Sequence, residues 1–216
     1  MQSISLQAQQ LKKSYNRRVI FSDVNFSLRE SNSLAIVGRN GSGKSTLLKI
    51  LAGVLSSSEG ETVVTCNGSR VKPADMFQYI GFVAPYLQLY EEFSALENLE
   101  IFKKIRCLDV PETYPVSLLE KVNLEHRKHD LVRTYSSGMK QRLKFAFALL
   151  HRPPILLLDE PSSNLDVEGI ASVYQIVEEQ KKQGIVVIAT NDPEEMRLCE
   201  QSIDLNSQAT TGGGKI

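Results

Sequence analysis

The 216-residue sequence has no excess of charge of either sign, with 25 lysines and arginines against 25 aspartates and glutamates. Proteins that find nucleic acid by bulk electrostatics carry a basic domain or face, so this balance argues against a nucleic-acid partner. The three cysteines, Cys66, Cys107 and Cys199, are widely spaced and form no CxxC pair. Their pattern argues against a disulfide framework or a zinc site and favours a reducing compartment.

Long apolar runs are absent as well. No run approaches the roughly 20 residues that a helix needs to span a bilayer. The opening stretch lacks the apolar centre of a secretory signal. We therefore expect a soluble protein, and a chain of this length with 42% hydrophobic residues can bury a sizeable core as one domain.

Short apolar runs alternate with stretches of helical period. The runs at 34–37, 155–158 and 185–189 have the length and composition of central strands in a parallel sheet covered on both faces. They predict an α/β fold with a mainly parallel sheet. Residues 86–151 show helical signals instead, including a capping box at Ser94 and Glu97, and predict an inserted α-helical subdomain. Residues 206–216 have no periodicity and predict a disordered tail.

A glycine-rich loop follows the first apolar run and precedes a helical stretch. It matches the pattern G-x-x-x-x-G-K-[ST] with Gly38, Arg39, Asn40, Gly41, Ser42, Gly43, Lys44, Ser45 and Thr46. In such a loop the backbone N–H groups surround the β- and γ-phosphates, and the helix N-terminus adds its positive dipole end. Lys44 would supply a charge between the phosphates, and the Ser45 hydroxyl would ligate Mg²⁺. The loop predicts nucleotide binding rather than a structural turn.

Two carboxylates, Asp159 and Glu160, end the apolar run at 155–158. Successive residues at a strand end diverge, so the two side chains can have separate roles. Asp159 would bind Mg²⁺ through water, and Glu160 would orient or deprotonate the attacking water. The alternative is a solvated acidic loop after a core strand.

Taken together, these residues resemble the ATP-binding cassette (ABC) ATPases, in the form of a transporter's nucleotide-binding domain, over about residues 4–205. The segment YSSGMKQR at 135–142 is similar to the family signature, usually LSGGQ. The segment EPSSNLD at 160–166 is similar to the end of the Walker B motif and the D-loop. Tyr15 is similar to the aromatic residue that stacks on adenine. The resemblance implies that the D-loop residue is Asp166, and that the signature residues reaching the partner subunit's ATP are Ser136, Ser137, Gly138 and Met139.

The resemblance also implies the fold, the cofactors and the partners. It implies a P-loop NTPase (RecA-like) core with N-terminal antiparallel β strands and the inserted helical subdomain, all in one ABC ATPase domain at 1–205. The cofactors would be ATP and Mg²⁺. The partners would be a second copy or a homologous subunit, paired head to tail, and a separate transmembrane permease subunit. The chain would then sit in the cytoplasm, peripheral to the inner face of the cell membrane. The apolar stretch 86–93 is a candidate docking surface for the permease, although its residues equally suit the insertion's own core.

The chain departs from the family pattern in its signature, which has Ser137 and Met139 where glycine and glutamine are usual, and at two further positions. The Q-loop glutamine would fall at Pro85, which has no side-chain donor or acceptor. Gln88 is the candidate replacement as an Mg²⁺ ligand, with a plain surface glutamine as the alternative. The switch histidine is Asn191, whose amide can donate to a phosphate oxygen but cannot titrate near neutral pH. With Lys44, Glu160 and Asn191 as the catalytic set, we expect a modest ATPase with no pH inflection from position 191.

Three other functions stay open from the sequence. A soluble ABC ATPase acting on ribosomes or DNA usually carries tandem cassettes, coiled-coil inserts or basic extensions, which are not seen here. A cassette that binds ATP with little turnover is compatible with Asn191. A small-molecule kinase would not explain the signature segment before the second carboxylate motif. The transported substrate and the direction of transport cannot be read, because specificity lies in the membrane subunit.

Overall fold

The apolar runs form the centre of a five-stranded parallel sheet. The computed structural model describes residues 3–16 and 18–208. The strand order is β6 (Ile80–Val83), β7 (Ile155–Asp159), β8 (Ile185–Ala189), β3 (Ser33–Val37) and β9 (Gln201–Asp204). Every pairing in this sheet is parallel. Strands β7 and β8 are buried along their whole length, as expected for central strands covered on both faces. The predicted parallel sheet is confirmed.

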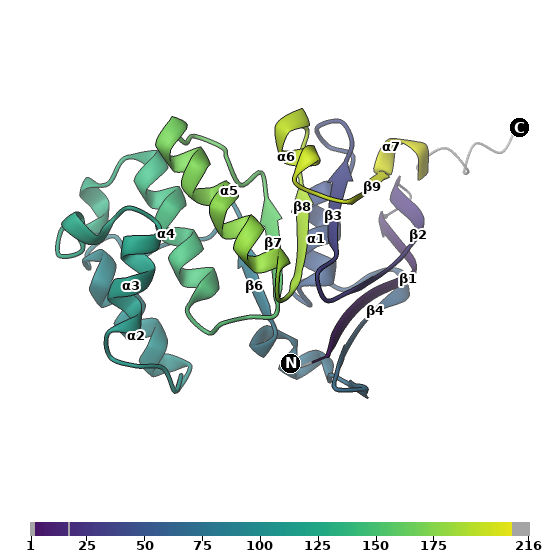
Figure 1. Cartoon of the computed structure of the whole chain (residues 1–216). Helices are drawn as coiled ribbons and strands as arrows, with labels where there is room; N and C mark the ends of the chain where they lie inside the picture. Colours follow the sequence, from purple (N-terminus) through teal and green to yellow (C-terminus); the bar gives the residue numbers. More distant parts are fainter. Residues whose placement is uncertain (1–2, 17, 209–216) are drawn as a thin grey trace, which may run out of the picture.

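A second, antiparallel sheet lies beside the first and comes largely from the N-terminal part of the chain (Figure 1). Its order is β2 (Arg18–Arg29), β1 (Ile4–Tyr15), β4 (Glu59–Cys66) and β5 (Ser69–Arg70). The resemblance implied N-terminal antiparallel strands without their bounds, and β1 and β2 each run for 12 residues. Register shifts between Ala8 and Ser14 interrupt their pairing, and such bulges break the strict alternation by which a strand is found in a sequence.

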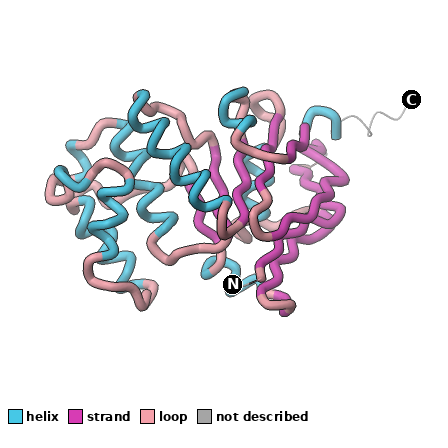
Figure 2. Tube along the Cα trace, in the orientation of Figure 1, coloured by secondary structure: helices cyan, strands magenta, loops and turns pink. Residues whose placement is uncertain are grey.

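The described part of the segment 86–151 is helical, as its sequence predicts. It contains α2 (Ala95–Ile105), α3 (Tyr114–Lys121) and α4 (Ser137–Leu149), with the short 3₁₀ turns η2 (Glu125–Arg127) and η3 (Val132–Thr134). Figure 2 shows these helices gathered at one end of the molecule and the strands at the other. The capping box is present, since Ser94 accepts from the Glu97 N–H and Glu97 accepts from the Ser94 N–H. It fixes the start of α2.

The remaining helices border the parallel sheet. They are α1 (Lys44–Leu51), α5 (Val167–Lys181), α6 (Pro193–Arg197) and α7 (Leu205–Gln208), and the turn η1 (Pro73–Gln78) precedes β6. Helix α7 takes in residues 206–208 of the stretch that we expected to be a disordered tail, and residues 209–216 lie outside the described part. No helix in the described ranges has the length and apolar character needed to cross a bilayer.

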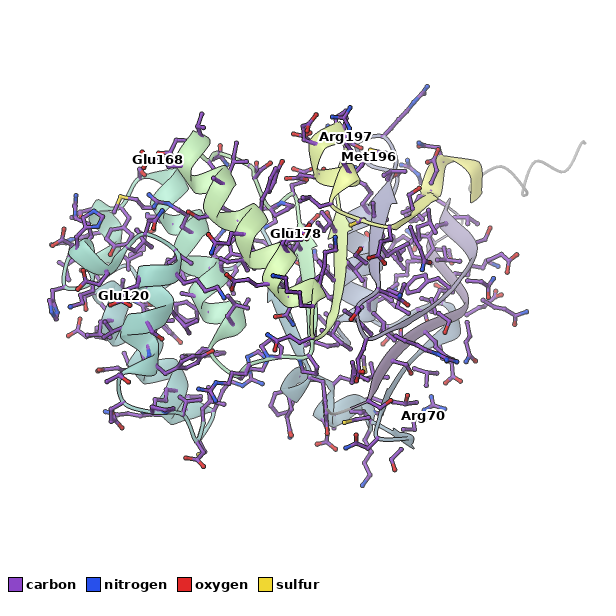
Figure 3. All side chains as sticks on the ribbon, in the orientation of Figure 1. Arg70, Glu120, Glu168, Glu178, Met196 and Arg197 are labelled. Carbon is purple, nitrogen blue, oxygen red and sulfur yellow. The ribbon has the colours of Figure 1, made fainter. Side chains whose placement is uncertain are left out.

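Side chains of both charge signs are interspersed over the surface. Figure 3 labels Glu120, Glu168, Glu178 and Arg197 on helices, and Arg70 on β5. Exposed pairs such as Arg133 Nη1 with Glu92 Oε2, 3.4 Å apart, join opposite charges. The balanced composition is therefore distributed over the fold.

Candidate functional site

Three of the predicted site segments meet at one edge of the parallel sheet. The glycine-rich loop follows β3, Glu160 follows β7 and Asn191 follows β8, and these strands are neighbours in the order β7-β8-β3. In parallel sheets, ligands bind beyond the carboxyl ends of the strands. A hollow of about 290 Å³ lies there, lined by Ile20, Asn40, Gly41, Gly43, Lys44, Ser45, Thr46 and Glu160. The sheet thus gathers residues that are far apart in the sequence.

The loop conformation depends on glycine at Gly43, the residue before α1. Its φ is +102°, and a β-carbon there would lie 2.5 Å from Cγ2 of Ile20. With no side chain, Gly43 cannot cap α1, and no acidic residue occupies the first turn. The first N–H groups of a helix have no intrahelical acceptor, so this helix start presents donors and a positive dipole end to the hollow. These are the features of a phosphate cradle, and they fit the phosphates of ATP.

Lys44 supplies the positive charge of the hollow from a buried position, with 6% of its surface exposed. Its Nζ donates to the Gly38 carbonyl at 2.7 Å and to Asn191 Oδ1 at 3.2 Å. The Asn191 amide in turn donates to Asn40 Oδ1 at 2.7 Å. Asn191 therefore contacts both Asn40 and Lys44 of the loop, and in this resting arrangement it holds the ammonium that would bind phosphate.

Asp159 is buried next to Ser45, which lines the hollow, and has 2% of its surface exposed. The Ser45 hydroxyl donates to Asp159 Oδ1 at 3.0 Å. Burial raises the pKa of Asp159, and the Ser45 hydrogen bond opposes that shift. A hydroxyl and a carboxylate side by side are the oxygen ligands that Mg²⁺ takes, so these two residues fit the metal.

Glu160 is exposed at the mouth of the hollow and has a φ of +48°. This left-handed conformation is uncommon for a residue with a side chain and costs energy that the surroundings must supply. The Glu160 N–H donates to the Ala189 carbonyl at 2.9 Å. Two residues on, Ser162 donates its N–H to Glu195 at 2.8 Å and also its hydroxyl to the same carboxylate.

Glu195 was missed as a site residue by sequence reasoning. It is 1% exposed on α6 and fixes the turn after Glu160. The local sequence shows only an acidic helix start at Asp192, whose side chain accepts from the Glu194 N–H. No local pattern distinguishes a buried Glu195 from its solvated neighbour.

The predicted signature residues form the start of α4. Ser136 is the N-cap and accepts from the Met139 N–H at 3.2 Å. A β-carbon at Gly138 would lie 2.9 Å from the Asn164 carbonyl, so the helix packs closely on the loop after Glu160. Asp166, the predicted D-loop residue, caps α5 by accepting from Gly169. The signature residues do not line the chain's own phosphate hollow.

Tyr15 and Gln88 are among the predicted residues that lie outside the lining of that hollow. Tyr15 ends β1 with 48% of its surface exposed and Lys13 Nζ 4.9 Å from its ring centroid. Ile20, on the strand paired with β1, does line the hollow. Gln88 borders a separate hollow of about 390 Å³ that Lys140 and Lys144 also line.

Tyr86 was not singled out as a site residue, and although 47% of its surface is exposed it contacts Lys49 on the helix that carries Ser45. Burial raises its pKa, and the charge of Asp159 adds to the effect. Its ring covers Lys49, with Nζ 4.1 Å from the centroid. The only signal in the sequence was its place directly after Pro85.

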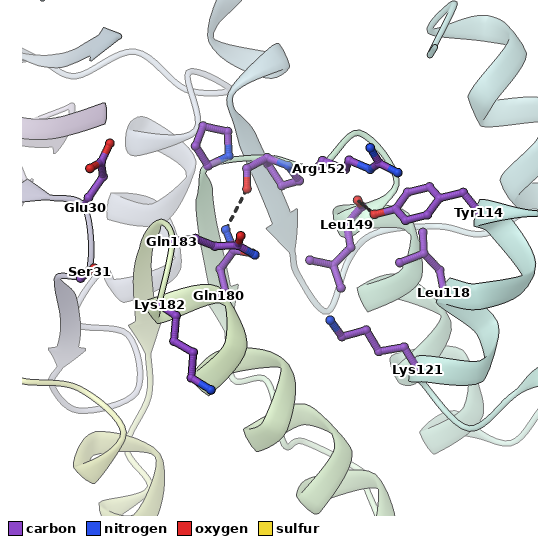
Figure 4. Close-up of a pocket in the computed structure, with 12 residues that line it drawn as sticks. Glu30, Ser31, Tyr114, Leu118, Lys121, Leu149, Arg152, Gln180, Lys182 and Gln183 are labelled. Carbon is purple, nitrogen blue, oxygen red and sulfur yellow. Dashed lines mark hydrogen bonds between the residues drawn. The ribbon is translucent and has the colours of Figure 1, made fainter. Parts of the chain in front are cut away.

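A larger cleft, of about 500 Å³, lies at the opposite edge of the parallel sheet (Figure 4). Its walls include the residues that precede β7 and β8, with Gln180 donating to the Pro153 carbonyl at 2.8 Å. It contains none of the loop or carboxylate residues. The residues that fit phosphate line the smaller hollow at the carboxyl edge.

Comparison with known proteins agrees with this geometry. A family model described as ABC transporter matches residues 21–163. The lantibiotic transport ATP-binding protein SrtF of Streptococcus pyogenes is 36% identical over 186 residues, covering 86% of this chain and 79% of SrtF. The lipoprotein-releasing system ATP-binding protein LolD of Shewanella oneidensis is 34% identical over 206 residues, covering 89% of this chain and 90% of LolD.

A solved structure has the same fold. The dimer of the ATP-binding cassette MJ0796 in a post-hydrolysis state, bound to ADP and Pi, matches with a TM-score of 0.81 at 25% identity. The match covers 92% of this chain and 93% of that chain. Since the family model spans the phosphate loop and both carboxylates, the chain belongs to the ABC transporter family and is one of its ATP-binding ATPase subunits.

Proposed function

We propose that this chain drives transport by closing head to tail on a second copy or a homologous subunit, with two ATP molecules between them, and that a separate membrane subunit converts the closure into substrate movement. The observation that carries the proposal is the position of the signature. The Ser136 cap is built as an anion-binding helix start, yet it does not line the hollow of its own chain. A second subunit can bring such a cap to the exposed phosphates.

Within one hollow we assign the roles as follows. The start of α1 and Lys44 bind the β- and γ-phosphates, Ser45 and Asp159 hold Mg²⁺, and Tyr15 stacks on adenine. When bound, Mg²⁺ would neutralise charge on the phosphate oxygens. Glu160, exposed at the mouth, orients and deprotonates the attacking water, and the Asn191 amide donates to the γ-phosphate. The fixed turn at Ser162 and Glu195 keeps Glu160 in place.

The membrane subunit would dock on an apolar hollow of about 200 Å³ between the parallel sheet and the helical segment. Its lining includes Phe77, Phe82, Leu87, Phe102 and Phe147. Phe77 is 53% exposed, and the exposed Tyr90 and Phe93 stack edge to face nearby in sequence, 6.1 Å apart. An exposed aromatic surface of this kind suits a protein partner. Docking there would place the chain at the inner face of the cell membrane.

Glu160→Gln provides the test of the dimer. The amide cannot deprotonate water, so ATP with Mg²⁺ should persist and hold two subunits together. Sedimentation velocity should then show a monomer without nucleotide and a dimer with ATP and Mg²⁺. As the matched control, Glu160→Gln combined with Ser136→Ala removes the cap hydroxyl and should weaken the dimer about tenfold. A Glu160→Gln chain that binds ATP yet stays monomeric, with its membrane partner also present, would overturn the proposal.

The relatives named above act on different cargoes, a lantibiotic for SrtF and lipoproteins for LolD. We therefore propose no cargo for this chain. Purification of the chain from membranes, with identification of the polytopic protein that accompanies it, is the experiment that would name the transporter.

A further inference from the structure

The segment after β6 runs directly past the metal side of the phosphate hollow. Strands β6 and β7 pair in parallel, with Val83 opposite Leu158. The next residues along each strand are Ala84 and Asp159, so the chain leaves β6 beside the buried carboxylate. Whatever follows Ala84 is therefore placed near Asp159 by the register of the sheet.

A tight turn then fixes Tyr86. The Leu87 N–H donates to the Ala84 carbonyl at 3.1 Å, which closes a four-residue turn with Pro85 and Tyr86 at its centre. Proline at the second position of such a turn sets the backbone in advance. The Pro85 carbonyl also accepts from Lys144 Nζ of α4 at 2.7 Å. Pro85 has no side-chain donor or acceptor, but its fixed backbone thus sets the direction in which Tyr86 leaves the turn.

Contacts on two sides hold the Tyr86 ring. Lys49 Nζ lies 4.1 Å from the ring centroid, a cation–π contact. Phe82 meets the ring edge to face at 6.1 Å. Lys49 is four residues after Ser45 on α1, so both lie on one face of the helix, and that face carries the Ser45–Asp159 hydrogen bond.

Electrostatics agree with this placement. Burial raises the pKa of Asp159 and the nearby charge of Lys49 opposes that shift, while burial raises the pKa of Tyr86 and the negative charge of Asp159 adds to it. No direct hydrogen bond joins Tyr86 to Asp159 among the contacts of the described residues, so a hydrogen bond between phenol and carboxylate would have to pass through a water. Mg²⁺ keeps several of its waters when protein carboxylates bind it.

We propose that Tyr86 is a positioning residue of the phosphate site, whose hydroxyl hydrogen-bonds to a water of the Mg²⁺ shell at Asp159. The inference rests on the proposed function, because it needs nucleotide and metal in this hollow. It assigns the contact with the Mg²⁺ shell to Tyr86 instead of Gln88. It also joins the metal to the docking surface, since Phe82, which contacts the Tyr86 ring, lines the apolar hollow proposed for the membrane subunit.

The test is Tyr86→Phe, which removes the hydroxyl and keeps the ring on Lys49. Tyr90→Phe is the matched control, because Tyr90 is exposed on the same segment and stacks on Phe93, away from Lys49. Mn²⁺ is the probe, with the non-hydrolysable analogue AMP-PNP as nucleotide, and electron paramagnetic resonance counts free Mn²⁺. Fluorescence of a labelled AMP-PNP in EDTA measures metal-free nucleotide affinity.

Loss of one hydrogen bond to the metal's water should weaken Mn²⁺ binding about 3- to 10-fold in Tyr86→Phe. Metal-free AMP-PNP affinity should stay within about twofold, and Tyr90→Phe should match the unaltered chain in both measurements. Equal Mn²⁺ affinity in Tyr86→Phe and the unaltered chain would overturn the inference, as would an equal loss of metal-free nucleotide affinity. If the unaltered chain binds no AMP-PNP at all, the proposed function fails instead.

Discussion

Replacement of Asn191 by alanine should change ATP binding and ATP turnover in opposite directions. In the resting structure Asn191 Oδ1 accepts from Lys44 Nζ at 3.2 Å and so helps to hold the ammonium on the loop carbonyl of Gly38. Before Lys44 can bind phosphate, it must leave these acceptors. In the working complex the Asn191 amide instead donates to the γ-phosphate. Asn191→Ala therefore removes a brake on binding and a donor for the reaction.

The magnitudes follow from the geometry of these contacts. Hydrogen bonds to charged groups contribute about 1.5–3 kcal/mol when well formed. The 3.2 Å separation is longer than the usual 2.7–2.9 Å of a charge-assisted bond. We therefore take about 1 kcal/mol, or about fivefold tighter nucleotide binding. Loss of one neutral donor to the transferring phosphoryl group should lower kcat about 10- to 100-fold, below the loss for a principal oxyanion donor.

The assay measures both quantities in the same preparation. Phosphate release against ATP concentration gives kcat with Mg²⁺ present, and calorimetric titration with AMP-PNP gives the dissociation constant. Asp192→Asn is the matched control, because it is the next residue and its side chain caps α6 by accepting from Glu194. An asparagine keeps the cap, so neither quantity should move by more than about twofold.

Two results would refute the reasoning. If Asn191→Ala leaves kcat within twofold, the amide does not act on the phosphate. If nucleotide binding weakens together with kcat, the contact with Lys44 is not a resting brake. Asn191→His extends the experiment, since an imidazole with an ordinary pKa of about 6.5 should introduce an inflection near neutral pH that the unaltered chain lacks.

Three further predictions concern stability and the dimer. Burial, with the Arg106 charge adding, lowers the pKa of His151 to about 4. As the pH falls, His151 therefore gains its proton in the unfolded chain before it does so in the folded chain. The free energy of unfolding, at its full value above pH 6.5, should decrease by about 2 kcal/mol between pH 7.5 and pH 5. Urea unfolding of His151→Gln should show a smaller decrease in the free energy of unfolding over this pH range. A decrease as large as that of the unaltered chain would contradict the assignment. Ser94→Ala should cost about 1 kcal/mol through the lost helix cap, measured against Ser117→Ala, and equal midpoints would count against it. Gly138→Ala should abolish the ATP-dependent dimer, because its β-carbon would lie 2.9 Å from the Asn164 carbonyl, and sedimentation of a dimer would show that the helix start has room.

The features that the sequence predicted correctly depend on neighbouring residues. Central strands are found from continuous apolar runs, and the start of α2 from two side chains three residues apart. The bounds of β1 and β2 were not found from the sequence, because such a local pattern is interrupted there. Their pairing shifts register between Ala8 and Ser14, so the period of two that predicts a strand is lost over much of their length.

The site could be predicted only in part from the sequence, for a related reason. The loop at 38–46 is a continuous segment, and its glycines and lysine carry their chemistry wherever the segment folds. Tyr86 and Glu195 have no such segment. Their roles arise from a turn set by Pro85 and from a helix that folds back on Ser162. Gln88 was a candidate because of its amide, but it lies three residues after Pro85 and borders another hollow.

The sequence by itself determined the phosphate loop, the carboxylate pair and the alternation of strand and helix, because each depends on backbone freedom or side-chain period within a few residues. Only the tertiary structure decided which side chains meet there. Asn191 reaches Lys44 across 147 positions because β8 and β3 are neighbours in the sheet. The chain leaves β6 opposite Asp159, two residues before Tyr86, because β6 pairs with β7 in one register. Strand order and register are set by burial of the whole core, and no short stretch of residues encodes them.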